Sequence, residues 1–289
     1  MKSNELLKQS IKFLKSYSKE TPELDSKMIL GFVLDLKNKI YLHDDVNVSE
    51  KKLIKFKKLL NLRANGKPVS RIIGKKYFWK DVFNINDWTL DPRPDSEILI
   101  EEVLLYYHNK EKNFKILDLG CGSGCLGLSL LGEFPNAMLI GVDQCKKALA
   151  QAKKNSKELF CNHRSNFLNV NWFNKNWTKD ILQNSNFKTK FDIIICNPPY
   201  IKKKQINNLQ EEVKYFDPVL ALDGGKDGCD SYRAILNKVS HLISNEGIIA
   251  IEISDEILLK VKNIILKQGL NVKKIVQDYS GNNRVLIIK

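Results

Sequence analysis

Short apolar segments alternate with helix-length stretches over the C-terminal two thirds of the chain, and this alternation restricts its fold more than any other feature. The segments are rich in β-branched residues and contain few polar ones, which indicates strands buried on both faces. They cover residues 115–119, 138–143, 164–169, 191–196 and 248–253. Because strands that alternate with helices form parallel βαβ units, we expect an α/β fold with a doubly wound, mostly parallel sheet.

Two further strands are expected close to the end of the sequence, at residues 271–278 and 284–288. The connection around residues 280–282 is too short for a helical crossover, so these two strands should pair antiparallel. They bring the predicted sheet to seven strands.

The first 95 residues have other patterns. In residues 1–66, apolar residues recur at helical spacing between lysines, which predicts a small helical bundle. In residues 67–95, β-branched and aromatic residues, among them Val69, Ile72 and Ile73, predict a β-hairpin linker. The α/β domain then covers residues 96–289, and Asp95 or Ser96 is placed to cap its first helix.

The chain is basic, with 47 Lys and Arg against 33 Asp and Glu and a net charge of +14. Such an excess favours acidic partners, including RNA. The lysines are also spread along the predicted helices, as expected for solvated faces, and the chain is rich in Asn and Ile as well. Direct contact with nucleic acid therefore stays open on charge alone and is not predicted.

The cysteines and histidines do not indicate a metal site. The 6 Cys include no C-x-x-C pair, and the 4 His have no ligand spacing, so we expect no zinc. No signal peptide or membrane-spanning segment is visible, so no membrane partner is expected. A reducing cytoplasm is the expected location.

A glycine-rich loop joins the first predicted strand to the helix after it. Its residues are Gly120, Cys121, Gly122, Ser123 and Gly124. Glycines allow the backbone to take positive φ and to approach a ligand closely. With Gly127, the loop also satisfies the dinucleotide fingerprint, so spacing alone does not separate NAD from S-adenosylmethionine.

Two acidic residues accompany this loop. Asp143 ends the second strand, where it can accept hydrogen bonds from ribose hydroxyls or cap the next helix. Asp118 comes just before the glycines and favours a ligand with a positively charged amino acid end over a pyrophosphate.

The tetrapeptide Asn197-Pro198-Pro199-Tyr200 follows the strand at residues 191–196. Proline has no N–H to donate to a sheet, so the strand must end here in a stiff loop. Ligands of open α/β sheets bind at this edge. The tetrapeptide is compatible with a simple strand-ending turn, but it resembles the amino-group-binding motif of methyltransferases that modify exocyclic or amide nitrogens.

The whole chain resembles the protein-(glutamine-N5) methyltransferases that act on peptide chain release factors, a family of class I S-adenosylmethionine-dependent enzymes. The resemblance rests on four stretches: residues 92–94 (Pro-Arg-Pro), 118–124, 197–200 and 220–228. It implies methylation of the glutamine amide in the Gly-Gly-Gln loop of a release factor. A monomer is expected, although the sequence does not determine the oligomeric state. It also implies that residues 1–66 recognise the substrate and that residues 96–289 are the catalytic domain.

The resemblance also implies roles for individual residues. The cofactor contacts carried over are Gly120, Cys121, Gly122, Ser123, Gly124, Asp143, Trp172 and Asn197. The substrate contacts are Asn197, Pro198, Pro199 and Tyr200, with Asn197, Pro198 and Tyr200 as catalytic residues. Trp177 lies close enough to Trp172 in the sequence to be an alternative cofactor contact.

The chain departs from the family pattern in three places. It has Pro94-Asp95-Ser96-Glu97 where many relatives have Pro-Glu-Thr-Glu, a basic run at residues 202–204, and Ser254 where glycine is expected. The lysines of the basic run leave the choice of substrate open.

Four alternative functions remain. An adenine-N6 methyltransferase of DNA or RNA would share the tetrapeptide, the cofactor and the positive charge. A glutamine methyltransferase of a ribosomal protein is related, but the stretch at residues 92–95 favours the release factor type. A NAD-dependent dehydrogenase explains the glycines without the tetrapeptide. A non-catalytic binding protein is disfavoured because no element of the site is missing.

Overall fold

The computed structural model describes residues 1–36, 45–184 and 190–289, and its contacts divide the chain into two compact units. The first unit contains residues 1–75 and 210–216, and the second contains residues 76–209 and 217–289. The division therefore falls after residue 75, and most of the hairpin expected as a linker belongs to the second unit.

The first unit is helical, as residues 1–66 predict. Its helices are α1 (Ser3–Ser16), α2 (Pro22–Leu34), α3 (Glu50–Ala64), α4 (Val69–Ile73) and α9 (Glu211–Lys214). Their apolar faces form one core, in which Leu14, Ile29, Leu30 and Phe56 are fully buried. Proline at the first position of α2 fits a helix start, because the missing N–H would have no partner there.

The prediction of β-structure for Val69, Ile72 and Ile73 is wrong, because these residues form α4. Their spacing of i, i+3 and i+4 places them on one face of a helix. Gly74 ends this helix in the left-handed conformation, with φ of 71°. The two-stranded sheet follows, with β1 (Lys75–Phe78) and β2 (Asp81–Asn84).

A buried arginine attaches residues 210–216 to the first unit. The Nε atom of Arg63 donates to Oδ2 of Asp25 at 2.6 Å, and its Nη1 atom donates to Oε1 of Glu212 at 2.5 Å. Arg63 and Asp25 are each only 7% exposed. Removal of one partner from a buried ion pair leaves a charge without compensation, so these contacts favour a fixed position for Glu212 in this unit.

The second unit contains a seven-stranded sheet in the order β5-β4-β3-β6-β7-β9-β8. The strands are β3 (Lys115–Leu119), β4 (Met138–Asp143), β5 (Ser165–Asn169), β6 (Phe191–Cys196), β7 (Ile243–Glu252), β8 (Val272–Gln277) and β9 (Asn283–Ile288). The first five are parallel, and β9 is antiparallel to both β7 and β8. This confirms the predicted doubly wound, mostly parallel sheet with an antiparallel final pair.

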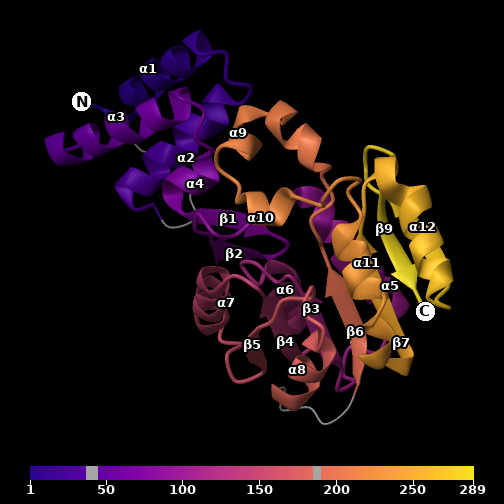
Figure 1. Cartoon of the computed structure of the whole chain (residues 1–289). Helices are drawn as coiled ribbons and strands as arrows, with labels where there is room; N and C mark the ends of the chain where they lie inside the picture. The colour runs from indigo at the N-terminus through magenta and orange to yellow at the C-terminus, as the bar shows by residue number, and fades with distance from the viewer. Residues whose placement is uncertain (37–44, 185–189) are drawn as a thin grey trace. The chain divides into compact units, whose positions relative to one another are not determined.

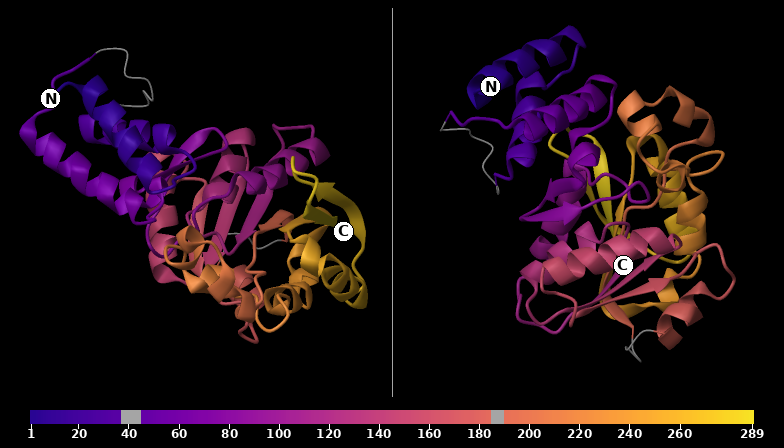
Figure 2. Two further views of the ribbon diagram at one scale, coloured as in Figure 1. Left: turned by 90° about the horizontal axis from the view of Figure 1, so that it is seen from above. Right: turned by 90° about the vertical axis from the view of Figure 1, so that its left-hand side faces the viewer.

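Helices cover both faces of this sheet (Figure 1). On one face lie α5 (Glu97–Tyr106), α6 (Cys125–Glu133) and α7 (Lys146–Glu158), and on the other lie α8 (Trp177–Asn184), α11 (Asp230–Leu236) and α12 (Leu258–Lys267). Successive residues of a strand point to opposite faces, so Ile193 packs under the first set and Ile194 under the second. Because helices cover both faces of the sheet, residues on both sides of each strand are buried, and the strands are apolar along their length. Figure 2 gives two further views of the layers.

Short helices complete the second unit: α10 (Val219–Leu222) and the 3-10 turns η1 (Pro94–Ser96), η2 (Lys203–Asn208), η3 (Val239–His241) and η4 (Asp255–Ile257). Among residues 1–36, 45–184 and 190–289, no helix has the length and apolar character needed to cross a membrane.

Candidate active site

The glycine loop begins where β3 ends and leads into α6. Gly120, Gly122 and Gly124 have φ of +76°, +54° and +80°, a conformation that L side chains rarely adopt. The N–H groups of Gly120 and Cys121 donate to the carbonyl of Val142 at 2.8 and 2.9 Å, which ties the loop to β4. A β-carbon added at Gly122 would meet no atom within 4 Å, so the loop backbone faces open space there.

Asp143 lies at the end of β4 and binds the backbone of the glycine loop through its carboxylate. Its Oδ2 accepts from the N–H of Gly122 at 3.0 Å, and its Oδ1 accepts from the N–H of Cys145 at 2.8 Å. Burial raises the pKa of this carboxyl above its ordinary value. Cys145 directly precedes α7, so both predicted roles of Asp143, helix cap and hydroxyl acceptor, are compatible with its position.

Asp118 is buried behind the loop, with 1% of its surface exposed. Its Oδ2 accepts from the N–H of Gly127 at 3.1 Å, whereas its Oδ1 has no partner among the described residues. Burial raises the pKa of Asp118 to about 7. A β-carbon at Gly127 would lie 3.0 Å from Asp118 Oδ2, which explains why a glycine stands at this position of the helix.

The tetrapeptide follows β6 and is connected by hydrogen bonds to residues far away in the sequence. Asn197 Nδ2 donates to Ser96 Oγ at 3.1 Å, and Ser96 Oγ donates to Glu252 Oε2 at 2.5 Å. The hydroxyl of Tyr200 donates to Glu252 Oε1 at 3.4 Å. Neither Asp95 nor Ser96 makes a capping bond from its side chain, so that prediction is wrong: the Ser96 hydroxyl is engaged by Glu252 instead.

The glycine-rich stretch at residues 220–228 packs directly on the tetrapeptide. Ile201 N–H donates to the carbonyl of Leu222 at 3.0 Å, and Gly224 N–H donates to the carbonyl of Ile201 at 2.8 Å. A β-carbon at Gly224 would lie 2.8 Å from the Cα of Tyr200. The absence of a side chain at Gly224 therefore allows the backbone of residues 220–228 to pack against the tetrapeptide. The residue pattern alone did not predict this contact.

One pocket brings the glycine loop and the tetrapeptide together. It holds about 830 Å³ of empty space, part of it open to solvent. The candidate residues that line it are Gly120, Cys121, Gly122, Ser123, Asp143, Trp172, Asn197 and Pro199. The other candidates, Gly124, Pro198 and Tyr200, are not among its lining residues.

The two tryptophans considered as cofactor contacts both belong to the core on the α8 face of the sheet, but they differ in their access to the pocket. Trp172 lines the pocket, and its ring is so close to Gly120 that a β-carbon there would lie 3.0 Å from it. Trp177 is 1% exposed and belongs to the core on the α8 face of the sheet. Only Trp172 is therefore placed to contact a ligand in the pocket.

Several lining residues were not among the candidates. They come mostly from the segment before α5 and from the segment around α10, and they include Phe78, Trp88, Arg93, Pro218 and Leu220. The guanidinium of Arg93 donates to Asp217, and the N–H of Asp91 donates to the same carboxylate at 3.2 Å. In the sequence, only the Pro-Arg-Pro stretch indicated that this part of the pocket wall is functional. The sequence analysis also missed Glu252, although an acidic residue at the end of an apolar strand can indicate a functional site.

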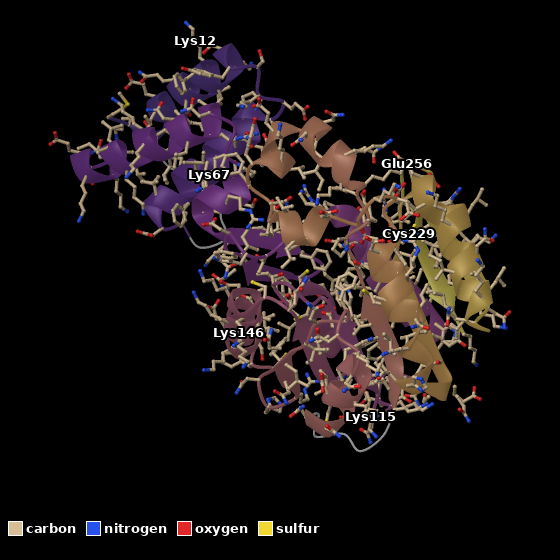
Figure 3. The ribbon with its side chains drawn as sticks, viewed as in Figure 1. Lys12, Lys67, Lys115, Lys146, Cys229 and Glu256 are labelled. Carbon is tan, nitrogen blue, oxygen red and sulfur yellow. The ribbon has the colours of Figure 1, made fainter. Side chains whose placement is uncertain are left out.

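The basic run after the tetrapeptide is partly neutralised. Lys202 Nζ lies 2.7 Å from Oε2 of Glu256, which is labelled in Figure 3. Gln205 donates to the same oxygen at 3.3 Å. Lys202 therefore acts at least partly as a structural partner of the η4 turn.

Comparisons with known proteins find similarity over most of the chain. Residues 5–74 match the family model of the PrmC N-terminal domain, and residues 95–215 match that of the methyltransferase small domain. A release factor glutamine methyltransferase of Caulobacter vibrioides is 32% identical over 95% of this chain and 91% of its own length. Proteins with the same name from Rhodospirillum rubrum and Buchnera aphidicola are each 34% identical, over 96% and 99% of this chain and 81% and 98% of their own lengths.

Proposed function

This chain belongs to the release factor glutamine methyltransferases, and we propose that it transfers a methyl group from S-adenosylmethionine to the side-chain amide nitrogen of a glutamine in a peptide chain release factor. The observation that carries this function is that one pocket is lined by both the glycine loop and Asn197. A methyl donor and an amide acceptor can meet only where a cofactor site and an amide site share one space.

The residues around the glycine loop fit S-adenosylmethionine. The open space at Gly122 admits a ligand close to the backbone, and Asp143 offers carboxylate oxygens to ribose hydroxyls. Two buried polar atoms, Asp118 Oδ1 and Trp172 Nε1, have no partner within the described residues. The negative charge of Asp118 favours the cationic amino acid end of this cofactor. When bound, S-adenosylmethionine supplies a methyl group on a sulfonium, which is a good leaving group.

The chain's own contribution is orientation. A primary amide nitrogen is a poor nucleophile, because its lone pair is delocalised into the carbonyl. The Oδ1 atom of Asn197 and the backbone carbonyl of Pro198 each accept one amide hydrogen, and Pro199 and Tyr200 complete the amide site. Orientation of this kind supplies up to about 7–11 kcal/mol. The same two acceptors stabilise the positive charge that develops on the nitrogen.

One assay tests the substrate. The protein is incubated with methyl-labelled S-adenosylmethionine and, in parallel, with a release factor, ribosomal proteins and nucleic acid, and the modified residue is identified by mass spectrometry. We expect label on the glutamine of the Gly-Gly-Gln loop. Label on adenine, or on a ribosomal protein glutamine alone, would support one of the two alternative methyltransferases instead.

A variant tests the role of Asn197. We expect Asn197→Ala to bind S-adenosylhomocysteine with nearly unchanged affinity and to lose at least about 10²-fold in single-turnover methyl transfer. Binding is measured by calorimetry and transfer by rapid quench. Transfer at the wild-type rate would exclude Asn197 as the amide acceptor.

Finer features are proposed with this function. The enzyme acts as a monomer on release factors in the cytoplasm, where translation is terminated. No membrane partner is expected, and direct contact with nucleic acid is open but not predicted. Sedimentation of the enzyme alone and with a release factor measures the stoichiometry.

A further inference from the structure

Three side chains from distant parts of the sequence meet at the wall of the pocket. Ser96 ends the η1 turn, Asn197 follows β6, and Glu252 ends β7. Ser96 and Asn197 are 101 positions apart, and Ser96 and Glu252 are 156 apart. Ser96 and Glu252 are 3% and 2% exposed, whereas Asn197 is half-buried, and both Ser96 and Asn197 line the pocket. The hydrogen bonds thus run from the buried carboxylate of Glu252 through the Ser96 hydroxyl to the Asn197 amide in the pocket wall.

The chemistry of donors and acceptors fixes the direction of these hydrogen bonds. An ionised carboxylate can only accept, so the single hydrogen of the Ser96 hydroxyl goes to Glu252 Oε2. The Ser96 oxygen then has only lone pairs to offer, and the group of Asn197 that faces it must be the NH2. With the opposite amide orientation, two acceptors would face each other. The Oδ1 atom of Asn197 is consequently the atom left for the pocket.

Glu252 is held in place from several elements. The hydroxyl of Tyr200 donates to Oε1 at 3.4 Å, and the hydroxyl of Tyr232 donates to the backbone carbonyl of Glu252 at 2.7 Å. Arg284 acts on Glu252 through its charge and is itself paired with Asp278 at 2.8 Å and with Asp95 at 3.4 Å. The charge of Asp95 also acts on Glu252, and the Cys196 thiol and the Tyr232 phenol interact electrostatically with Glu252.

We infer that Ser96 and Glu252 are positioning residues, which orient the Asn197 amide so that its oxygen, not its NH2 group, faces the substrate. The inference rests on the proposed function, because the oxygen is the atom required to accept a hydrogen from the glutamine amide. Neither residue is needed to touch the substrate or the methyl donor. Their effect is to make one of two nearly isosteric orientations of Asn197 the stable one.

The protonation state of Glu252 controls this orientation. Burial raises the pKa of Glu252 to about 7. Below that pH the carboxyl carries a proton and can donate it to Ser96, and the Ser96 hydroxyl is then free to donate to Asn197 Oδ1. The amide would turn its NH2 group toward the substrate. Turnover should therefore rise as pH increases through about 7 and level off above it.

Three variants test the inference against wild-type enzyme and an intact release factor. Ser96→Ala removes the hydroxyl, Ser96→Thr keeps it, and Glu252→Gln replaces the carboxylate by a neutral group of the same shape. We expect Ser96→Ala to lower kcat by about 10- to 100-fold while KM and the affinity for S-adenosylhomocysteine change by less than about 3-fold. Ser96→Thr should keep kcat within about 3-fold of wild type. Glu252→Gln should lower kcat and abolish the rise of kcat between pH 6 and 8.

Asp118 also has a pKa of about 7 and is proposed to contact the methyl donor, so the pH profiles are measured with saturating S-adenosylmethionine and include Asp118→Asn to separate the two titrations. The rise of kcat with pH should remain in Asp118→Asn and disappear in Glu252→Gln. A kcat of Ser96→Ala equal to that of wild type, or an unchanged pH profile of Glu252→Gln, would overturn the inference. The proposed function would still hold if the wild-type enzyme methylates the release factor. If Glu252→Gln does not fold, the inference is tested by comparing Ser96→Ala with Ser96→Thr. Equal kcat values in these two variants would overturn the inference. Wild-type enzyme that methylates no release factor would reject the proposed function itself.

Discussion

Three carboxyl groups close to the pocket are buried or half-buried, yet each has different partners. Asp143 accepts from two backbone N–H groups, Asp118 from one, and Glu252 from two hydroxyls. Burial raises the pKa of all three, because a charged carboxylate loses its hydration. Groups whose pKa is shifted in this way gather at functional sites, since these sites need charge in a place where water is excluded.

Asp118 gives a pH-dependent prediction at the scale of one residue. Its pKa is raised from 3.8 to about 7 in the folded protein, so the folded state binds the proton more tightly than the unfolded state. The contribution of this group to stability is present below pH 4 and is lost as pH rises to about 7. Asp118→Asn stays neutral and can still accept from Gly127. We expect its free energy of unfolding to exceed that of wild type by an amount that grows to as much as about 4 kcal/mol at pH 8.

Urea unfolding of both proteins between pH 4 and 8 measures this difference. Contributions from the other carboxyl groups are the same in both proteins and cancel in the comparison. A difference that stays constant over this pH range would contradict the assigned shift.

The two tryptophans offer a matched pair of substitutions. Trp172→Phe should weaken the binding of S-adenosylhomocysteine by about 5- to 10-fold, because the ring lines the pocket beside Gly120. Trp177→Phe should lower the free energy of unfolding by about 1–3 kcal/mol and leave binding nearly unchanged, because its ring lies in the core. Calorimetry and urea unfolding measure the two effects. If Trp177→Phe weakens binding and Trp172→Phe does not, Trp177 is the cofactor contact.

At the scale of elements, the site depends on strand ends that lie level with one another. Leu119 at the end of β3 is in register with Val142 on β4 and with Cys196 at the end of β6. The glycine loop, Asp143 and Asn197 each follow or lie beside one of these residues. Parallel strands thus bring three separate sequence motifs to one edge, which is where open α/β sheets bind ligands.

The support of the tetrapeptide by a second backbone leads to a prediction for Gly224. Gly224→Ala would place a β-carbon 2.8 Å from the Cα of Tyr200 and 2.9 Å from the carbonyl of Pro199. The tetrapeptide must then shift, and a displacement of about 1 Å costs about 10²-fold in rate. We expect that loss in kcat, with S-adenosylhomocysteine bound as in wild type.

Gly132→Ala is the control for this substitution. A β-carbon at Gly132 would meet no atom within 4 Å, and this residue is exposed on α6. It should leave kcat unchanged and raise stability by about 0.5–1 kcal/mol, because alanine loses less backbone entropy than glycine in a helix. Equal kcat values for the two variants would mean that the support at Gly224 has no effect on the site.

At the scale of the whole molecule, the positive charge is unevenly distributed along the chain. Residues 1–75 carry 17 Lys and Arg against 8 Asp and Glu, a net charge of +9 out of the total of +14. Lysines such as Lys12 in the first unit and Lys146 in the second are exposed (Figure 3). Charge concentrated in one part of a protein steers the association of a partner of opposite charge. This supports the proposal that the N-terminal unit recognises the protein substrate.

Charge reversal tests this proposal without deleting any part of the chain. We expect the triple substitution Lys8→Glu, Lys12→Glu and Lys15→Glu on α1 to lower kcat/KM for an intact release factor by about 10-fold at low salt. The same enzyme should act normally on a short Gly-Gly-Gln peptide, which has no surface for the helical unit.

The matched control carries the same change of net charge on α7, at Lys153, Lys154 and Lys157, which are exposed. It should affect the release factor and the peptide equally. If both triple variants lose the same activity on the release factor, net charge and not the helical unit is responsible.

The sequence by itself determined the order and type of most elements. Apolar β-branched runs are typical of strands buried on both faces, so the strands of the sheet and its antiparallel end could be predicted from local composition and connection length. The glycine loop, Asp143 and the tetrapeptide could be found because each needs an unusual backbone or a polar residue at the end of an apolar strand. The helix α4 was mispredicted, because a short run of β-branched residues is compatible with either type of element.

Only the tertiary structure decided which distant residues meet. It brings Ser96 and Glu252 next to Asn197, packs Gly224 on Tyr200, and gives Trp172 but not Trp177 access to the pocket. Local sequence reports backbone preference and burial, which depend on neighbours along the chain. A hydrogen bond across 156 positions depends instead on the register of strands and the packing of helices, and no short pattern contains that information.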